Sequence, residues 1–156
     1  MNAIKSTYGD DVAVLGFPCN QFGHQTNEGE SEILNTLKYV RPGNGFEPNF
    51  DVFGKVNVNG AQAHPLFKFL RASIPIPMDP PGDTKGNGAD DIDVLILPRG
   101  GFDTTTVTLW SPVTRTDIAW NFEKFLIDGN GNVVRRYSRF YPTADIATDI
   151  NELLNK

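Results

Sequence analysis

Neutral side chains that donate hydrogen bonds can stabilise an anion, and this sequence carries several of them. Gln21 and Asn121 carry amide N–H groups, and Trp120 carries an indole N–H that can only donate. A thiolate, the nucleophilic form of a thiol, is one anion that neutral donors of this kind stabilise without acting as acids themselves. Their residue types alone are typical of an ordinary loop and an ordinary core strand, so a catalytic role needs a second line of argument.

Cys19 is the only cysteine in the chain, which excludes an internal disulfide. It directly follows an apolar run and Pro18. That position predicts a small buried side chain rather than a reactive nucleophile.

Metal and nucleotide chemistry find no support in the sequence. His24, His64 and Cys19 are too few and too scattered for a zinc site. Neither histidine has an evident serine or cysteine partner, and no glycine-rich phosphate loop is present. A set of aspartates could suggest calcium, but its spacing does not match an EF-hand and favours a solvated acidic loop: Asp79, Asp83, Asp90, Asp91 and Asp93.

The N-terminal half predicts alternating helices and strands. Residues 2–8 can form a short helix, and the apolar run Val12–Phe17 predicts a strand buried on both faces. Asn27 and Glu30 have the spacing of a capping box. The helix after them would face inward with Ile33, Leu34, Leu37 and Val40, and would end at Pro42–Gly43. A second helix should begin at Pro65, with Leu66, Phe67 and Leu70 facing inward.

The C-terminal part predicts a hairpin and a helix. Residues 119–127 and 133–137 are expected to be strands joined by a turn at 128–131. Thr143 is expected to cap the last helix, whose inner face carries Ile146, Ile150, Leu153 and Leu154. Between the two halves, residues 73–108 are rich in Pro, Gly and Asp and predict a long irregular, partly disordered loop. The whole, 1–156, is expected to be one α/β domain.

Several motifs resemble the glutathione peroxidase family. Leu15–His24 resembles the segment that follows the second sheet strand in that family, and Trp120–Leu126 resembles its W-N-F-x-K-F-L strand. Other segments resemble the tetrameric, glutathione-using subclass: Ile33–Gly43, Phe46–Phe50, Val58–Gly60 and Ala63–Phe67. The resemblance implies a thioredoxin-like fold, with a central mixed sheet flanked by helices.

The resemblance also implies a reaction and its residues. Hydrogen peroxide and organic hydroperoxides would be reduced with glutathione as co-substrate, through a selenenic or sulfenic acid that two glutathione thiols resolve. Gln21, Trp120 and Asn121 match the family's donors to the reacting anion, and Arg41 and Arg139 match positions that hold glutathione's carboxylates. Solvated surface arginines are the equally weighted alternative.

The peroxide-reacting selenocysteine or cysteine of the family would lie upstream of Met1, so we expect an N-terminally truncated chain that lacks the strand carrying it. Removing that strand would leave backbone groups unpaired on the strands at 12–17 and 119–127. We therefore expect the chain alone to be unstable and inactive. In the following helix, residues 35–40 hold no resolving cysteine, which excludes a two-cysteine mechanism.

Composition restricts the partners. The net charge is -5 and no Lys/Arg run occurs, so neither nucleic acid nor a membrane is an expected partner. Glutathione, hydroperoxides and other subunits of a homotetramer are expected, and the single cysteine with no secretory signal favours the cytoplasm. A non-catalytic thioredoxin-like isoform, serving as a binding or assembly subunit, is the alternative function.

Overall fold

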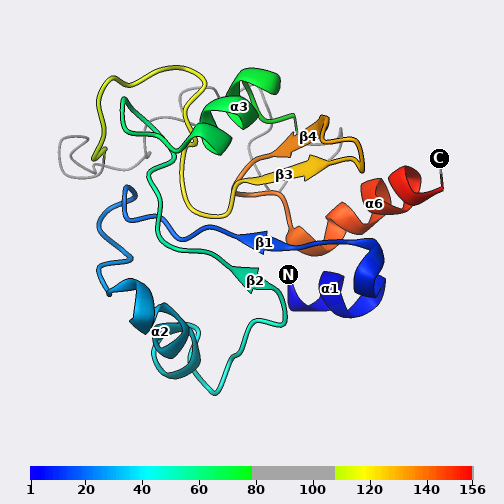
Figure 1. Ribbon diagram of the computed structural model, residues 1–156, viewed down its shortest axis with the longest axis horizontal. Coiled ribbons are helices and arrows are strands. Elements are labelled where there is room, and N and C mark those ends of the chain that lie inside the picture. Colours follow the sequence, from blue (N-terminus) through cyan, green and yellow to red (C-terminus); the bar gives the residue numbers. More distant parts are fainter. Residues whose placement is uncertain (79–107, 156) are drawn as a thin grey trace.

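The computed structural model describes residues 1–78 and 108–155, and within them the chain is an α/β protein (Figure 1). Most of the loop predicted at 73–108, with its five aspartates, lies outside the described residues. The single-domain prediction therefore stays a prediction. No helix in the described ranges is long and apolar enough to cross a bilayer.

The first sheet is a short parallel pair. Helix α1 (Asn2–Tyr8) leads through the 3-10 turn η1 (Gly9–Asp11) to β1 (Leu15–Gly16), which pairs in parallel with β2 (Asp51–Val52). The predicted strand Val12–Phe17 is thus correct in place but wrong in length and burial, because Leu15 is 47% exposed. Among the described strands β1 pairs with β2 alone, and the exposure of Leu15 shows that the apolar run is not covered on both faces.

The second sheet is the predicted hairpin. Strand β3 (Lys124–Ile127) pairs antiparallel with β4 (Val133–Tyr137), with a register shift at the turn end. The Asp128 side chain closes the turn by accepting the backbone N–H groups of Asn130 and Asn132. The predicted strand start at Ala119 is wrong, because residues 119–123 form a turn instead. Within the described residues the two sheets are separate two-stranded pairs, not the one central sheet that the resemblance implies.

Helix α2 (Ile33–Tyr39) follows the 3-10 turn η2 (Glu30–Glu32). Its capping box uses the backbone of Gly29 and the carboxylate of Glu32, not the predicted Asn27 and Glu30. The predicted inner face is also wrong in part, since Ile33 is buried but two members of the face are largely exposed: Leu34 at 55% and Val40 at 72%. Nothing in the described part of the chain covers that side of the helix.

Helix α3 (Pro65–Ser73) begins where it was predicted, with Pro65 in its first turn. His64 caps it, because its Nδ1 accepts the Leu66 N–H at 3.2 Å. Phe67 and Leu70 face inward as expected. They join a first core cluster of buried residues: Cys19, Phe22, Val58, Phe67, Leu70 and Ile118.

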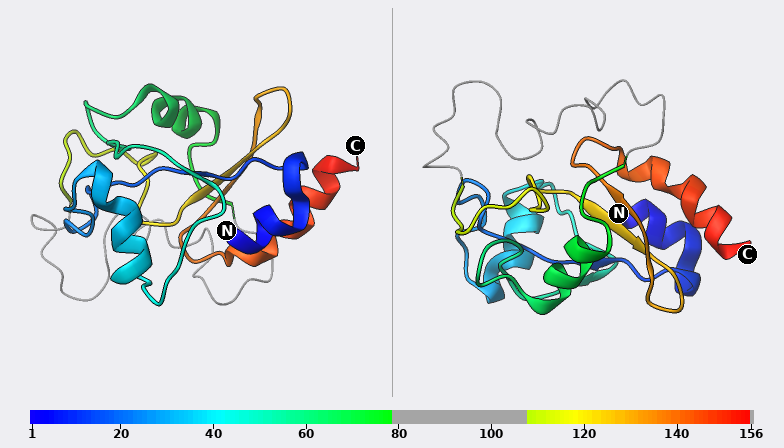
Figure 2. Two further views of the ribbon diagram at one scale, coloured as in Figure 1. Left: turned by 60° about the horizontal axis from the view of Figure 1, so that its bottom comes forward. Right: turned by 90° about the horizontal axis from the view of Figure 1, so that it is seen from above.

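The C-terminal helix forms the second core with α1. The 3-10 turn η3 (Thr143–Ile146) precedes α6 (Ala147–Leu154), and Thr143 makes no side-chain cap, so that prediction is wrong. Helices α1 and α6 lie side by side (Figure 2), and the Tyr8 hydroxyl donates to the Ala147 carbonyl at 3.1 Å. The buried residues of this cluster are Ile4, Tyr137, Tyr141, Ile146 and Ile150.

Candidate active site

The loop after β1 is held in shape by its own polar side chains. The Asn20 Oδ1 accepts the Thr26 N–H at 2.8 Å, and the Asn20 amide donates to Asn27 Oδ1 at 2.9 Å. Lys55 donates from outside the loop to the carbonyls of Thr26 and Glu28. These contacts fix the position of Gln21 and Gln25 at the two sides of the loop.

Gln21 is buried, with 6% of its surface exposed. Its Oε1 accepts the N–H groups of Val58 and Asn59 at 2.8 and 3.0 Å, and its Nε2 donates to the Asn59 carbonyl at 3.1 Å. The amide oxygen is therefore committed to backbone. Of the two amide hydrogens, one has a partner among the described residues and the other remains available.

Trp120 and Asn121 lie on the turn that precedes β3. The turn is closed by Glu123, whose Oε1 accepts the Ala119 N–H at 2.6 Å, and by a left-handed Phe122 with φ of 66°. The turn ends just before β3 begins, so Trp120 and Asn121 belong to the turn and not to the strand.

The two distant segments meet at this turn. The Trp120 ring packs on Phe22, with 5.6 Å between centroids, and the Asn121 amide donates to Gln25 Oε1 at 2.8 Å. The Trp120 indole N–H has no acceptor within the described ranges. The structure thus brings Trp120 and Asn121 against the loop that contains Gln21, through the neighbours of Gln21.

Arg139 joins this cluster from the end of the hairpin. Its guanidinium carbon lies 5.9 Å from the Trp120 ring centroid and 4.5 Å from that of Phe140. The Nε atom is buried without a hydrogen-bond partner in the described residues. Burial lowers the pKa of Arg139, and the Glu123 carboxylate opposes that shift. A partly dehydrated guanidinium with an unused N–H is suited to receive a carboxylate.

Arg41 is not part of the cluster. It is exposed and follows α2, which lies beyond β2 and away from the β3–β4 hairpin (Figure 1). Of the two predicted glutathione-binding arginines, the structure brings only Arg139 to the three donors.

Cys19 lies in the first core, close to Gln21. Its Sγ lies 3.4 Å from the Gln21 backbone nitrogen and 3.6 Å from Gln21 Oε1. Burial raises the pKa of the Cys19 thiol above its ordinary value. A thiol in this state is a poor nucleophile at neutral pH.

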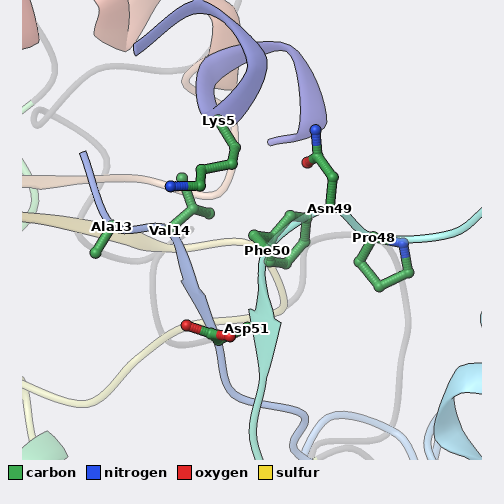
Figure 3. A pocket seen from close by; sticks show the side chains of 7 residues that line it. All are labelled: Lys5, Ala13, Val14, Pro48, Asn49, Phe50 and Asp51. Atoms are coloured by element: carbon green, nitrogen blue, oxygen red, sulfur yellow. The ribbon is translucent and has the colours of Figure 1, made fainter. Parts of the chain in front are cut away.

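A hollow of about 370 Å³ occurs elsewhere, between α1 and the β1–β2 pair. Its lining includes Lys5, Val14, Asn49 and Asp51, and Figure 3 shows the Lys5 side chain extended above the two strands. None of the predicted site residues contributes to it. No group of three or more His, Cys, Asp or Glu that could hold a metal ion occurs in the part of the chain that the structure describes.

Sequence reasoning missed the residues that support the donors. Gln25 contacts Asn121, and the buried Asn59 joins the Gln21 segment to the Ile118 backbone through two hydrogen bonds of 2.8 Å. Glu123 and Lys124 hold the adjacent turns. Asn59, Glu123 and Lys124 all lie inside the motifs quoted above, so their place in those motifs was the available signal.

Comparisons with known proteins show the family of this chain. Residues 1–71 match the family described as Glutathione peroxidase. Over 157 aligned positions the chain is 51% identical to glutathione peroxidase 1 of Rattus norvegicus, covering 100% of this chain and 70% of the rat protein. The corresponding Sus scrofa protein is 52% identical, and 68% of it is covered. The chain belongs to the glutathione peroxidase family.

Solved structures support the same assignment. The crystal structure described as T. cruzi GPX1 is 27% identical with a TM-score of 0.55, over 99% of this chain and 68% of that one. A crystal structure of Trgpx in apo form is 30% identical with a TM-score of 0.52, over 99% of this chain and 65% of that one. The glutathione peroxidase relatives are thus longer than this chain, which matches them along its full length.

Proposed function

We propose that this chain supplies the donor side of a glutathione peroxidase active site. In the complete enzyme, one hydroperoxide and two glutathione molecules would yield an alcohol or water, a second water and glutathione disulfide. The peroxide-reacting selenol or thiol is not among the residues of this chain, because Cys19 is its only cysteine and is buried with a raised pKa. The contact of Trp120 and Asn121 with the Gln21 loop is the observation that carries the proposal.

The three donors would act together on the reacting anion. Three N–H groups can each donate to a selenolate or thiolate. They are the indole N–H of Trp120, which has no acceptor among the described residues, and the second amide hydrogens of Gln21 and Asn121. Fixed donors lower the free energy of that anion and so keep it ionised at neutral pH. None of the three can lose its own proton at that pH, so none competes with the nucleophile.

Arg139 would bind a carboxylate of glutathione beside these donors. The Nε–H, which has no partner among the described residues, and the position of the guanidinium over the Trp120 ring both favour this assignment. Arg41 would attract glutathione from a distance, since it is exposed and lies apart from the cluster.

A coupled assay of glutathione oxidation tests the proposal. The 156-residue chain is expected to give no rate above background, whereas the product of the same coding region that includes an upstream selenocysteine or cysteine should turn over hydrogen peroxide. In that product, Trp120→Phe or Asn121→Ala should lower kcat/KM by about a hundredfold to a thousandfold, the range for losing one oriented donor.

Three results would contradict the proposal. One is an upstream coding sequence with neither an in-frame selenocysteine codon nor a cysteine codon after a strand-like stretch. Another is full activity in the Trp120→Phe and Asn121→Ala variants of the longer product. The third is peroxidase activity of the 156-residue chain that Cys19→Ser abolishes, since that would place the nucleophile at Cys19.

An assembly role is the second candidate, and the exposed apolar side of α2 favours it. Leu34, Tyr39 and Val40 are all more than half exposed. A subunit of this kind would join a homotetramer in the cytoplasm without reducing peroxide itself. Co-expression with a complete relative would separate the roles, because an assembly subunit co-purifies with it and leaves its activity per active subunit unchanged.

A further inference from the structure

The start of β3 carries two consecutive buried charges that hold different loops of the candidate site. Glu123 is the last residue before β3 and Lys124 is the first residue of the strand. The Glu123 side chain is 1% exposed, and Lys124 is 9% exposed. Charged side chains so deeply buried need compensating polar contacts, and each of the two obtains them from a loop that bears a proposed site residue.

Glu123 holds the turn that carries Trp120 and Asn121. One carboxylate oxygen accepts the Ala119 N–H at 2.6 Å, and the other accepts from Arg136 at 2.8 Å. Arg136 is itself fully buried and donates to the carbonyls of Thr116 and Asp117. The turn is therefore anchored at both ends, to the hairpin on one side and to the preceding segment on the other.

Lys124 holds the turn that carries Arg139. Its Nζ donates to the carbonyls of Ser138 at 2.8 Å and Tyr141 at 2.6 Å, on either side of Arg139 and Phe140. A buried ammonium that bridges two carbonyls fixes the curvature of the backbone between them. The Arg139 guanidinium then lies over the Trp120 ring, where the two anchored turns meet.

We propose that Glu123 and Lys124 are positioning residues that set the distance between the Trp120–Asn121 donors and the Arg139 guanidinium. Glu123 acts through Ala119 and Arg136, and Lys124 acts through the carbonyls of residues 138 and 141. Neither touches substrate. The effect on glutathione binding rests on the proposed function, whereas the effect on the relative position of Trp120 and Arg139 does not.

The experiment compares four variants in two measurements, in the 156-residue chain or, where that chain does not fold alone, in the longer product described above. Lys124→Met removes both hydrogen bonds to the carbonyls while keeping a side chain of similar length. Lys124→Gln retains a donor group, its amide NH2, and Glu123→Gln retains the acceptor for the Ala119 N–H. Tyr8→Phe is the matched control, because it removes the hydrogen bonds from the Tyr8 hydroxyl to Ala147 and Asn151, which lie between α1 and α6 and outside the site. The indole N–H resonance of Trp120 is followed by two-dimensional NMR, assigned with Trp120→Phe, and glutathione affinity is followed by calorimetric titration.

Lys124→Met is expected to shift the Trp120 indole resonance, as Arg139 leaves the ring, and to weaken glutathione binding about tenfold, the equivalent of one charge-assisted contact. Lys124→Gln should recover part of both effects. Glu123→Gln should shift the Trp120 resonance as well, while Tyr8→Phe lowers stability and changes neither readout.

The inference is overturned if Lys124→Met and Lys124→Gln leave the Trp120 resonance where it is in the unmodified chain. If Lys124→Met does not fold, the Lys124→Gln and Glu123→Gln spectra decide alone. The proposed function fails separately: if the unmodified chain does not bind glutathione, or if Arg139→Met binds it equally well, the NMR arm still tests the positions of the two turns.

Discussion

At the scale of single residues, burial decides which side chains are available for chemistry. Gln21 and Cys19 lie next to each other in the first core, yet they differ in what burial does to them. The amide of Gln21 gains backbone partners, whereas the thiol of Cys19 loses the hydration that would stabilise its anion. Nearness to a proposed site is therefore not enough to make Cys19 a nucleophile.

Cys19 should react slowly with thiol reagents in the folded chain. Its raised pKa keeps the thiol protonated through neutral pH, and the protonated form does not attack disulfide reagents. The sign of the pH effect follows: the unfolded thiol loses its proton above its ordinary pKa of 9.0 while the folded one keeps it, so stability falls as pH rises past that value. Labelling with a chromogenic disulfide at pH 8, with and without urea, measures the first effect.

Unfolding of Cys19→Ala between pH 8 and 10 measures the second effect. As pH rises, the free energy of unfolding of the unmodified chain should fall relative to that of Cys19→Ala. Rapid labelling of the folded chain, at the rate seen in urea, would contradict the assignment of a buried protonated thiol.

Gln21→Ala should destabilise the chain by about 2–6 kcal/mol. The substitution leaves the N–H groups of Val58 and Asn59 without an acceptor, and each buried donor left unpaired costs about 1–3 kcal/mol. Urea unfolding measures the loss. Gln25→Ala is the control, because Gln25 is an exposed amide whose removal should change stability by no more than about 0.5 kcal/mol.

At the scale of elements, the turn before β3 presents the donors at a conformational cost. Phe122 has φ of 66° and its side chain is 69% exposed, so the residue adopts a left-handed backbone and gains little from burial. The left-handed region is unfavourable for a side chain with a Cβ atom. The contacts that stabilise the turn, among them the hydrogen bond from the Ala119 N–H to Glu123, outweigh the preference of Phe122 for a negative φ.

Phe122→Gly should keep or raise stability, by up to about 1.5 kcal/mol. The substitution relieves about 1–2 kcal/mol of left-handed strain and loses about 0.5–1 kcal/mol through the greater chain entropy of glycine. Val113→Gly is the control: Val113 is also half exposed but lacks a positive φ, so it should lose stability. If Phe122→Gly is as destabilising as the control, the turn does not impose the strain described.

Elements set by local rules could be predicted from the sequence, and those set by distant contacts could not. The hairpin 124–137 and the start of α3 at Pro65 depend on turn chemistry and on a proline in the first turn, both of which are written in neighbouring residues. The predicted inner face of α2 depends on distant contacts. Periodicity places Leu34 and Val40 on one face of the helix but does not say which part of the protein would cover that face.

The same distinction applies to the candidate site. Trp120, Asn121 and Arg139 could be named from motifs, and the structure brings them together. The partners of Gln21 could not be named, because Val58 and Asn59 reach it only through folding of the intervening chain. The motifs group Arg41 with Arg139. In the structure, however, Arg41 follows α2, which lies away from the hairpin that leads to Arg139 (Figure 1).

At the scale of the whole molecule, a buried ion pair connects parts of the chain that the sheets leave separate. Asp117 pairs with Arg71 of α3 and accepts from the Trp110 indole at 2.7 Å and from the Thr114 N–H at 2.8 Å. The Asp117 side chain is 1% exposed. Helix α3 is thereby fixed to the segment that leads into the donor turn.

Asp117→Ala should cost about 3–5 kcal/mol, because it leaves the Arg71 guanidinium buried without its partner. Thermal or urea unfolding measures the loss, and Asp145→Ala, at an exposed acidic residue of η3, is the control that should change little. The double variant Arg71→Met with Asp117→Leu should recover much of the stability. A double variant no better than Asp117→Ala would show that the acceptor bonds of Asp117, not the lone charge, set the cost.

The division of the strands into two separate pairs also has a consequence for the order in which the molecule assembles. The β3–β4 hairpin joins residues that are close along the chain and can close within about microseconds. The parallel pair must first bring Leu15 to Asp51 across the loop that contains α2, at a larger entropic cost. Amide protons of the hairpin should therefore gain protection early during refolding, and those of the parallel pair only when the remainder of the chain has collapsed around it.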